Sequence, residues 1–102
     1  MSCPAGIDFD DINRAALSAL PILLRRWLPD GHMRGREFIA RNPTRNDRRP
    51  GSFTINTANG RWADFADGEA KGGDVVSLYA YLRRIGQGDA ARELASLLRV
   101  HP

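Results

Sequence analysis

The sequence predicts an α+β domain, because helical periodicity at both ends of the chain encloses a middle segment that alternates as β-strands do. Apolar residues recur at three- and four-residue spacing over 8–27 and 74–98, whereas residues 52–65 alternate around a turn. The 102 residues fit one domain with one hydrophobic core. We therefore expect a single domain over residues 1–102, in which a three-stranded antiparallel sheet packs against N-terminal and C-terminal helices.

The N-terminal helical stretch is interrupted by a proline. Pro21 lacks a backbone donor and cannot continue a helix from the preceding turn, although it fits the first turn of a new helix. We therefore expect two helices, at about 9–19 and 21–28, and a turn beginning at Pro29 that ends the second helix.

The middle of the chain predicts three short strands. Residues 35–41 are mixed in character and form the first strand. Segments 52–56 and 61–65 alternate polar and apolar residues and are joined through Asn59-Gly60, a pair that favours the tight turn of a β-hairpin. The sheet should therefore consist of this hairpin and one further strand.

Two further helices close the chain. A polar connection over 66–73 leads to Asp74, which can cap a helix over 75–85, and a last helix follows over 89–98. The two glycines before Asp74 are interpreted as turn and cap residues. A phosphate cradle is disfavoured there, because the carboxylate would itself occupy the anion site.

The basic charge of the chain is concentrated in one stretch. The formal net charge is +3, and fourteen of the fifteen basic residues are arginine. Residues 25–49 hold eight arginines against three acids, a local charge of +5, and residues 42–51 should be a loop because prolines are their only apolar residues. Arginine offers a planar fork for phosphates and base edges. The composition leaves nucleic-acid binding and an ordinary solvated surface equally open.

Neither a membrane span nor a signal peptide is visible in the sequence. No apolar run reaches the eighteen or so residues that a span needs, and residues 1–9 lack a basic stretch followed by an apolar one. We therefore expect a cytoplasmic chain without a membrane partner. Cys3 is the only cysteine, so an intrachain disulfide is excluded.

Four short segments, Asn42–Arg45, Arg49–Phe53, Trp62–Gly68 and Gly72–Leu78, follow one another along the chain. In their order and spacing they resemble the N-terminal zinc-ribbon domain of bacterial and phage DNA primases. In that family a Cys-Pro-x-His knuckle precedes a Pro-Ser-Phe strand, and a hairpin leads to a Cys-Phe-x-Cys-Gly knuckle and a Gly-Asp-Ile/Val helix start. The chain departs from this pattern by one inserted residue, Gly51, and by a longer path from the second knuckle to the helix. The resemblance covers about residues 34–85 and rests on these four segments.

The four zinc-ligand positions of the resemblance carry other residues in this chain, namely Asn42, Arg45, Asp64 and Asp67. A structural zinc site needs closely spaced sulfur and nitrogen donors, so we expect neither zinc nor another cofactor. We hypothesise that Arg45 bridges Asp64 and Asp67 and ties the two knuckles together in place of the metal. The alternative is that these side chains point to water, where such pairs contribute about 0 to 1 kcal/mol.

The resemblance implies a monomeric module that recognises single-stranded template DNA and assists primer initiation in replication. Catalysis would belong to a separate primase core, often followed by a helicase domain, and we expect no catalytic activity in the chain itself. Metal-free forms of this kind point to the primase and helicase proteins of phages and mobile elements.

The strand period of two predicts which side chains would meet DNA. We expect Phe53, Ile55 and Phe65 to point toward the helices and Trp62 to lie on the outer face, where an indole can stack on an unpaired base. A buried packing role for Trp62 is equally open. The expected contact set is Trp62, Arg34, Arg36, Arg45, Arg48, Arg49 and Arg61.

Two alternative functions belong to other classes. A protein–protein adaptor would dock a replication partner through the helical pair 73–98, and an exposed apolar patch there would favour it. A small metal-dependent nuclease would need its acids to cluster around magnesium, although four acids on one loop are more often solvated. The acids in question are Asp64, Asp67, Glu69 and Asp74.

Overall fold

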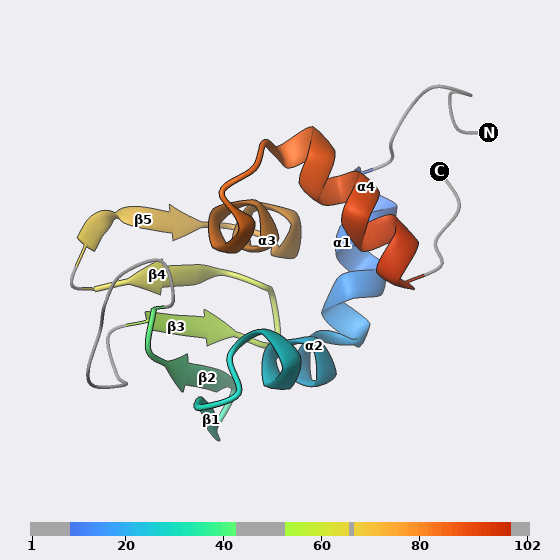
Figure 1. Ribbon diagram of the computed structural model, residues 1–102. Helices are drawn as coiled ribbons and strands as arrows, with labels where there is room; N and C mark the ends of the chain where they lie inside the picture. Colours follow the sequence, from blue (N-terminus) through green and yellow to red (C-terminus); the bar gives the residue numbers. More distant parts are fainter. Residues whose placement is uncertain (1–8, 43–52, 66, 99–102) are drawn as a thin grey trace.

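The computed structural model of the chain describes residues 9–42, 53–65 and 67–98. In this part of the chain two helices are followed by five strands and two further helices, so the expected α+β class is confirmed (Figure 1). The elements are α1 (Phe9–Ser18), α2 (Leu20–Trp27), β1 (His32–Arg34), β2 (Glu37–Ala40), β3 (Phe53–Asn56), β4 (Trp62–Asp64), β5 (Asp67–Gly72), α3 (Val75–Arg83) and α4 (Gln87–Leu98).

The helices begin and end close to where the sequence predicts. Pro21 lies in the first turn of α2, and Ala19 separates this helix from α1. Asp74 caps α3 as expected, because its Oδ1 accepts a hydrogen bond of 2.8 Å from the backbone N–H of Ser77. A second acceptor comes from α1, where Asn13 Oδ1 accepts from the backbone N–H of Val76 at 2.9 Å. The start of α3 is therefore held both by its own cap and by a distant helix.

The described strands form one antiparallel sheet in the order β1-β2-β3-β4-β5, with each strand paired to the next along the chain. The expectation of three strands is therefore wrong. β1 joins β2 through a tight turn at Gly35, which has a φ of 62°. β5 lies in the polar connection that was expected to be a loop. Both added strands lie at the sheet's edges, where backbone pairing on one side suffices and no apolar alternation is needed.

The β3–β4 hairpin is confirmed at its predicted position. Gly60 has a φ of 80°, a conformation that glycine adopts readily, and its N–H donates to the carbonyl of Asn56 at 2.8 Å. The backbone N–H of Asn56 in turn donates to the carbonyl of Arg61 at 2.7 Å. In the resulting register, Ile55 lies opposite Trp62 and Phe53 lies opposite Asp64.

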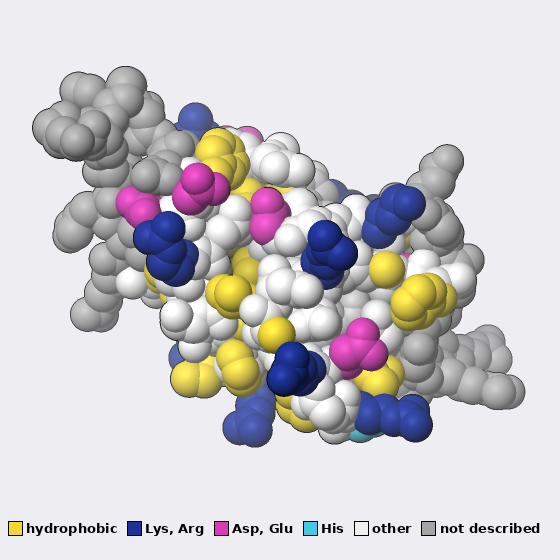
Figure 2. Space-filling view, turned by 180° about the vertical axis from the view of Figure 1, so that it is seen from behind, with side chains coloured by type: hydrophobic (Ala, Val, Ile, Leu, Met, Phe, Trp, Pro, Cys, Tyr) yellow, Lys and Arg dark blue, Asp and Glu magenta, His cyan; other side chains and the backbone are white. Residues whose placement is uncertain are grey.

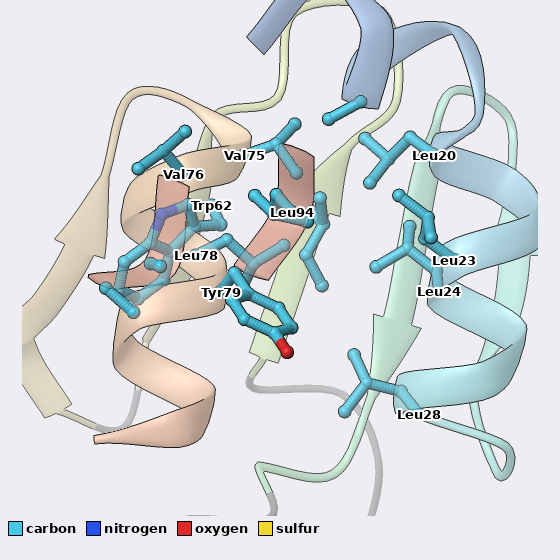
Figure 3. Packing of buried hydrophobic residues seen from close by; sticks show 14 of the residues in the cluster. Leu20, Leu23, Leu24, Leu28, Trp62, Val75, Val76, Leu78, Tyr79 and Leu94 are labelled. Carbon is cyan, nitrogen blue, oxygen red and sulfur yellow. The ribbon is translucent and has the colours of Figure 1, made fainter. Parts of the chain in front are cut away.

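One hydrophobic core lies between the sheet and the helices. The leucines of α2 point toward side chains from the strands and from α3 (Figure 3). α4 packs against α3 and α1, so the C-terminal helical pair expected from the sequence is present. None of the described helices combines the length and apolar character that crossing a membrane requires. The sheet thus has one face committed to the core and a second face turned away from it.

Gly72 fits tightly against the core at the end of β5. A Cβ atom built at this position would lie 2.4 Å from both Trp62 Nε1 and Ser77 Oγ. These two atoms are themselves joined by a hydrogen bond of 2.9 Å. A side chain at position 72 would therefore displace the indole or break its hydrogen bond.

We expect Gly72→Ala to lower the free energy of unfolding by about 1 to 3 kcal/mol, the usual cost of overpacking a core. Gly73→Ala is the matched control, because a Cβ at the neighbouring glycine meets no atom within 4 Å. Chemical denaturation of both variants measures the difference. Equal stability of the two would contradict the contact between position 72 and the indole.

Candidate nucleic-acid interface

Trp62 belongs to the core, so the expectation that it lies on the outer face is wrong. Residues directly opposite one another in an antiparallel pair share a face, and Trp62 lies opposite the buried Ile55. Its side chain is only 6% exposed, and its Nε1 donates to Ser77 Oγ at 2.9 Å. Its ring centroid lies 4.8 Å from that of Tyr81. The indole is a packing residue and offers no free face to a base.

Phe65 takes the exposed position that was expected for the tryptophan. We expected this ring to point toward the helices, but it is 74% exposed. It lies just beyond β4, whose pairing with β5 is irregular between Ala63 and Asp64. With Trp62 and Asp64 buried, Ala63 and Phe65 are left on the opposite side. An aromatic ring in this position is available to stack on a planar ligand.

The sheet register aligns polar and basic side chains in two rows on the face away from the core, which we call the outer face. The pairings Arg34↔Glu37 and Glu37↔Asn56 define the first row, and the bond from Asn56 to Arg61 extends it to β4. The second row runs across all five strands and contains His32, Ile39, Thr54, Ala63 and Lys71.

A shallow depression of about 500 Å³ lies on this outer face. Its middle is formed by the smaller side chains of Thr54 and Ala63, while Arg61, Lys71 and the ring of Phe65 stand around it. Its lining consists of Glu37, Thr54, Asn56, Arg61, Trp62, Ala63, Phe65, Lys71 and Gly72.

The cations of the outer face are available to a ligand. Arg34, Arg61 and Lys71 are exposed, and none of them forms an ion pair with a described residue. On the face of the molecule seen in Figure 2, Lys and Arg side chains are spread singly among apolar and polar ones. A ligand would therefore meet separate cations instead of one dense basic patch.

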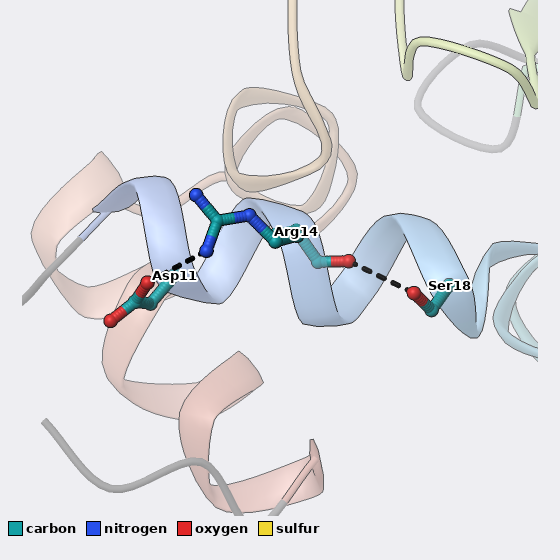
Figure 4. A network of polar contacts seen from close by, with 3 residues as sticks. All are labelled: Asp11, Arg14 and Ser18. Atoms are coloured by element: carbon teal, nitrogen blue, oxygen red, sulfur yellow. Dashed lines mark hydrogen bonds and ion pairs between the residues drawn. The ribbon is translucent and has the colours of Figure 1, made fainter.

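Other arginines are already paired within the protein. Arg41 contacts the carboxylate of Asp30 at 2.5 Å, and this hydrogen bond lowers the pKa of Asp30 below its ordinary value. On α1, Arg14 lies 3.3 Å from Asp11, one turn away, and Ser18 donates to the Arg14 carbonyl (Figure 4). These exposed pairs contribute little stability, but they distinguish paired arginines from those of the outer face.

Only some residues of the predicted DNA-contact set lie near one another in the described part of the chain. Arg34 and Arg61 lie in the first row, and Arg36 is exposed in the β1–β2 turn. The carbonyl of Arg36 accepts bonds of 2.7 Å from both the N–H and the Oγ1 of Thr57, which ties this turn to the β3–β4 loop. The remaining arginines of the set, Arg45, Arg48 and Arg49, lie outside the described residues.

Two of the four residues that the sequence resemblance aligns with zinc ligands meet in a buried hydrogen-bond network. Asn42 and Asp64 are each 1% exposed, and Asn42 Nδ2 donates to Asp64 Oδ2 at 2.8 Å. The same nitrogen donates to Tyr81 Oη at 2.7 Å, which extends the network into α3. The network therefore connects the end of β2, the end of β4 and the third helix.

The proposed tie through Arg45 lies outside the described residues, as does the side chain of Asp67. Sequence reasoning missed Tyr81 altogether. In the sequence Tyr81 is recognisable only as a residue next to the apolar positions of α3. This position does not predict the hydrogen bond between its hydroxyl and Asn42.

Two of the four acids considered for the alternative magnesium site have structural roles, and the side chains of Asp67 and Glu69 lie outside the described residues. Asp64 is buried and bonded to Asn42, while Asp74 caps α3. Within the described residues no group of three or more histidine, cysteine, aspartate or glutamate side chains could hold a metal ion.

We expect Asn42→Ala to lower the free energy of unfolding by about 2 to 3 kcal/mol, because it removes hydrogen bonds from a buried carboxylate and a partly buried hydroxyl. Arg92→Ala is the control, since it breaks an exposed ion pair of 2.7 Å with Asp89 and should cost less than about 1 kcal/mol. Urea denaturation compares the two variants. A loss for Asn42→Ala no larger than that of the control would show that the buried network does not stabilise the fold.

Comparison with known proteins gives no match for this chain among family models, curated proteins or solved structures. The relationship to primase zinc ribbons thus stays a prediction, based on the four sequence segments. The functional interpretation therefore depends on the chemistry of the outer face itself.

Proposed function

We propose that this chain is a primase-like module that binds single-stranded template DNA on the outer face of its sheet and assists primer initiation in replication. The observation that carries the proposal is the combination of the exposed Phe65 ring with Arg61 and Lys71 around one depression, two cations that form no ion pair with any described residue. The polymerising chemistry would reside in a separate primase core, with a helicase domain as a further partner.

The arrangement fits a single strand for two physical reasons. Cations at Arg34, Arg61 and Lys71 would attract the phosphates, and this attraction would weaken as salt rises. The ring of Phe65 can stack only on a base whose face is accessible, which a paired duplex does not offer along its length. The proposal therefore assigns affinity to phosphate contacts and the preference for single strands to the ring.

The predicted arginines between β2 and β3 are consistent with this site. The segment that carries Arg45, Arg48 and Arg49 begins after Asn42 and ends before Phe53. Phe53, where the described chain resumes, lies opposite Asp64, the neighbour of the exposed Phe65. We propose that these arginines extend the phosphate contacts near the exposed ring.

We expect Phe65→Ala to weaken binding to an oligothymidylate of about 15 nucleotides roughly 5- to 150-fold, the cost of losing one stacked base. Leu97→Ala is the matched control, because Leu97 is 52% exposed but lies on α4. Fluorescence anisotropy at constant salt measures both affinities. Equal affinity of the two variants would exclude Phe65 as a stacking platform.

We expect the double variant Arg34→Ala, Lys71→Ala to reduce the slope of log affinity against log salt concentration by about 1.4, since each single-strand phosphate contact contributes about 0.7. The double variant Arg14→Ala, Arg92→Ala removes the same charge from arginines that are paired on α1 and α4. An equal change of slope in both variants would indicate general charge attraction instead of a site on the sheet.

The protein–protein adaptor remains a second proposal, supported by two smaller features. Among the described residues of the helical pair, Leu97 is the one large apolar side chain that is exposed. A hollow of about 200 Å³ also lies between α2 and α3, lined by Trp27, Tyr79, Leu82 and Arg83. These features provide less accessible surface for a partner than the outer face does, so DNA binding is the leading proposal.

A further inference from the structure

Glu37 is an unexpected neighbour for the cations of the outer face. It is exposed, it lines the depression, and its carboxylate has no hydrogen bond or ion pair with any described residue. A carboxylate at this position repels phosphates, so it does not serve attraction to the DNA backbone. Its unpaired oxygens can instead accept hydrogen bonds from the edge of a base.

Glu37 and Arg61 lie in the first row with Asn56 between them, and Arg34 lies on the other side of Glu37. Two strand spacings of about 4.8 Å place their backbones about 10 Å apart. The Asn56 side chain is held back, because its Oδ1 accepts a hydrogen bond of 2.8 Å from the N–H of Ala58 in the loop. The space between the acid and the arginine is therefore open to a planar group that offers donors on one side and acceptors on the other.

We infer that this space selects guanine in the bound strand, an inference that rests on the proposed binding of single-stranded DNA. Guanine presents the donors N2–H and N1–H on its Watson–Crick edge and the acceptors O6 and N7 on the adjoining Hoogsteen edge, and both edges are accessible in a single strand. The two carboxylate oxygens of Glu37 accept from the donors, and the guanidinium of Arg61 donates to O6 and N7, its preferred bidentate contact. Adenine and cytosine each offer one amino group, and thymine offers a single N–H between two carbonyls, so none of them satisfies both side chains.

The guanine is a different nucleotide from the base on Phe65. The ring lies four residues from Arg61 along the chain, about 13 Å in an extended strand, and it stands at the opposite end of the depression. The bound strand therefore crosses the outer face with one base stacked on the ring and the guanine held in the row.

The test uses oligothymidylates of about 15 nucleotides that carry one central guanine, inosine or adenine, together with the unsubstituted strand. We expect the guanine strand to bind at least about fivefold more tightly than the adenine and unsubstituted strands. Inosine, which lacks the N2 amino group, should have intermediate affinity. In Glu37→Gln the preference for guanine should be lost, whereas Asp89→Asn, the same change of charge on α4, should retain it.

The possible results distinguish the guanine preference from the proposed binding of single-stranded DNA. Equal affinities of the wild-type chain for all four strands, or a guanine preference that persists in Glu37→Gln, would overturn the guanine assignment while the proposed DNA binding stands. Absence of binding to every strand would overturn both. A preference that disappears in Glu37→Gln but not in Asp89→Asn supports the assignment.

Discussion

The inward position of Trp62 is the constraint on which the two faces of the sheet depend. The indole packs near Phe53 and Tyr81 and donates to Ser77, which itself donates to the carbonyl of Asp74 at the cap of α3. Because side chains alternate along a strand, an inward Trp62 places Ala63 on the other side. The same contact excludes a side chain at Gly72. A single packed ring therefore positions β4, β5 and α3 together and determines which residues face solvent.

A second set of contacts joins distant parts of the fold through buried hydrogen bonds. Asn42 follows β2 and Asp64 ends β4, two strands that are not neighbours in the sheet, and Tyr81 comes from α3. Hydrogen bonds to a buried carboxylate are charge-assisted and directional, so they specify this arrangement more sharply than apolar contacts would. Asp64 is the neighbour of Phe65, so the network also fixes the backbone from which the exposed ring projects. Asp64, which has a structural role, and Phe65, the proposed binding residue, are thus adjacent in the chain.

The candidate site could be predicted only in part from the sequence. The sequence named Arg34 and Arg61 as contact residues, and both are exposed; it also placed an aromatic ring on the outer face of the hairpin, but assigned it to Trp62. That assignment was wrong because alternation along the strand places Trp62 and Phe65 on opposite faces without showing which of them faces the core. Only the pairing of β4 with β3 decides this. The contribution of Tyr81 could not be predicted, since it depends on how α3 lies against the strands.

The sequence by itself determined the local features: the break at Pro21, the turn at Gly60, the cap at Asp74 and the α+β class. Each depends on backbone preferences of residues close together in the chain, which are nearly independent of their surroundings. Only the tertiary structure decided the strands at both edges, the inward choice of Trp62 and the meeting of Asn42 with Asp64. These features depend on backbone pairing and burial between distant segments, and their free energy exists only once the segments have packed.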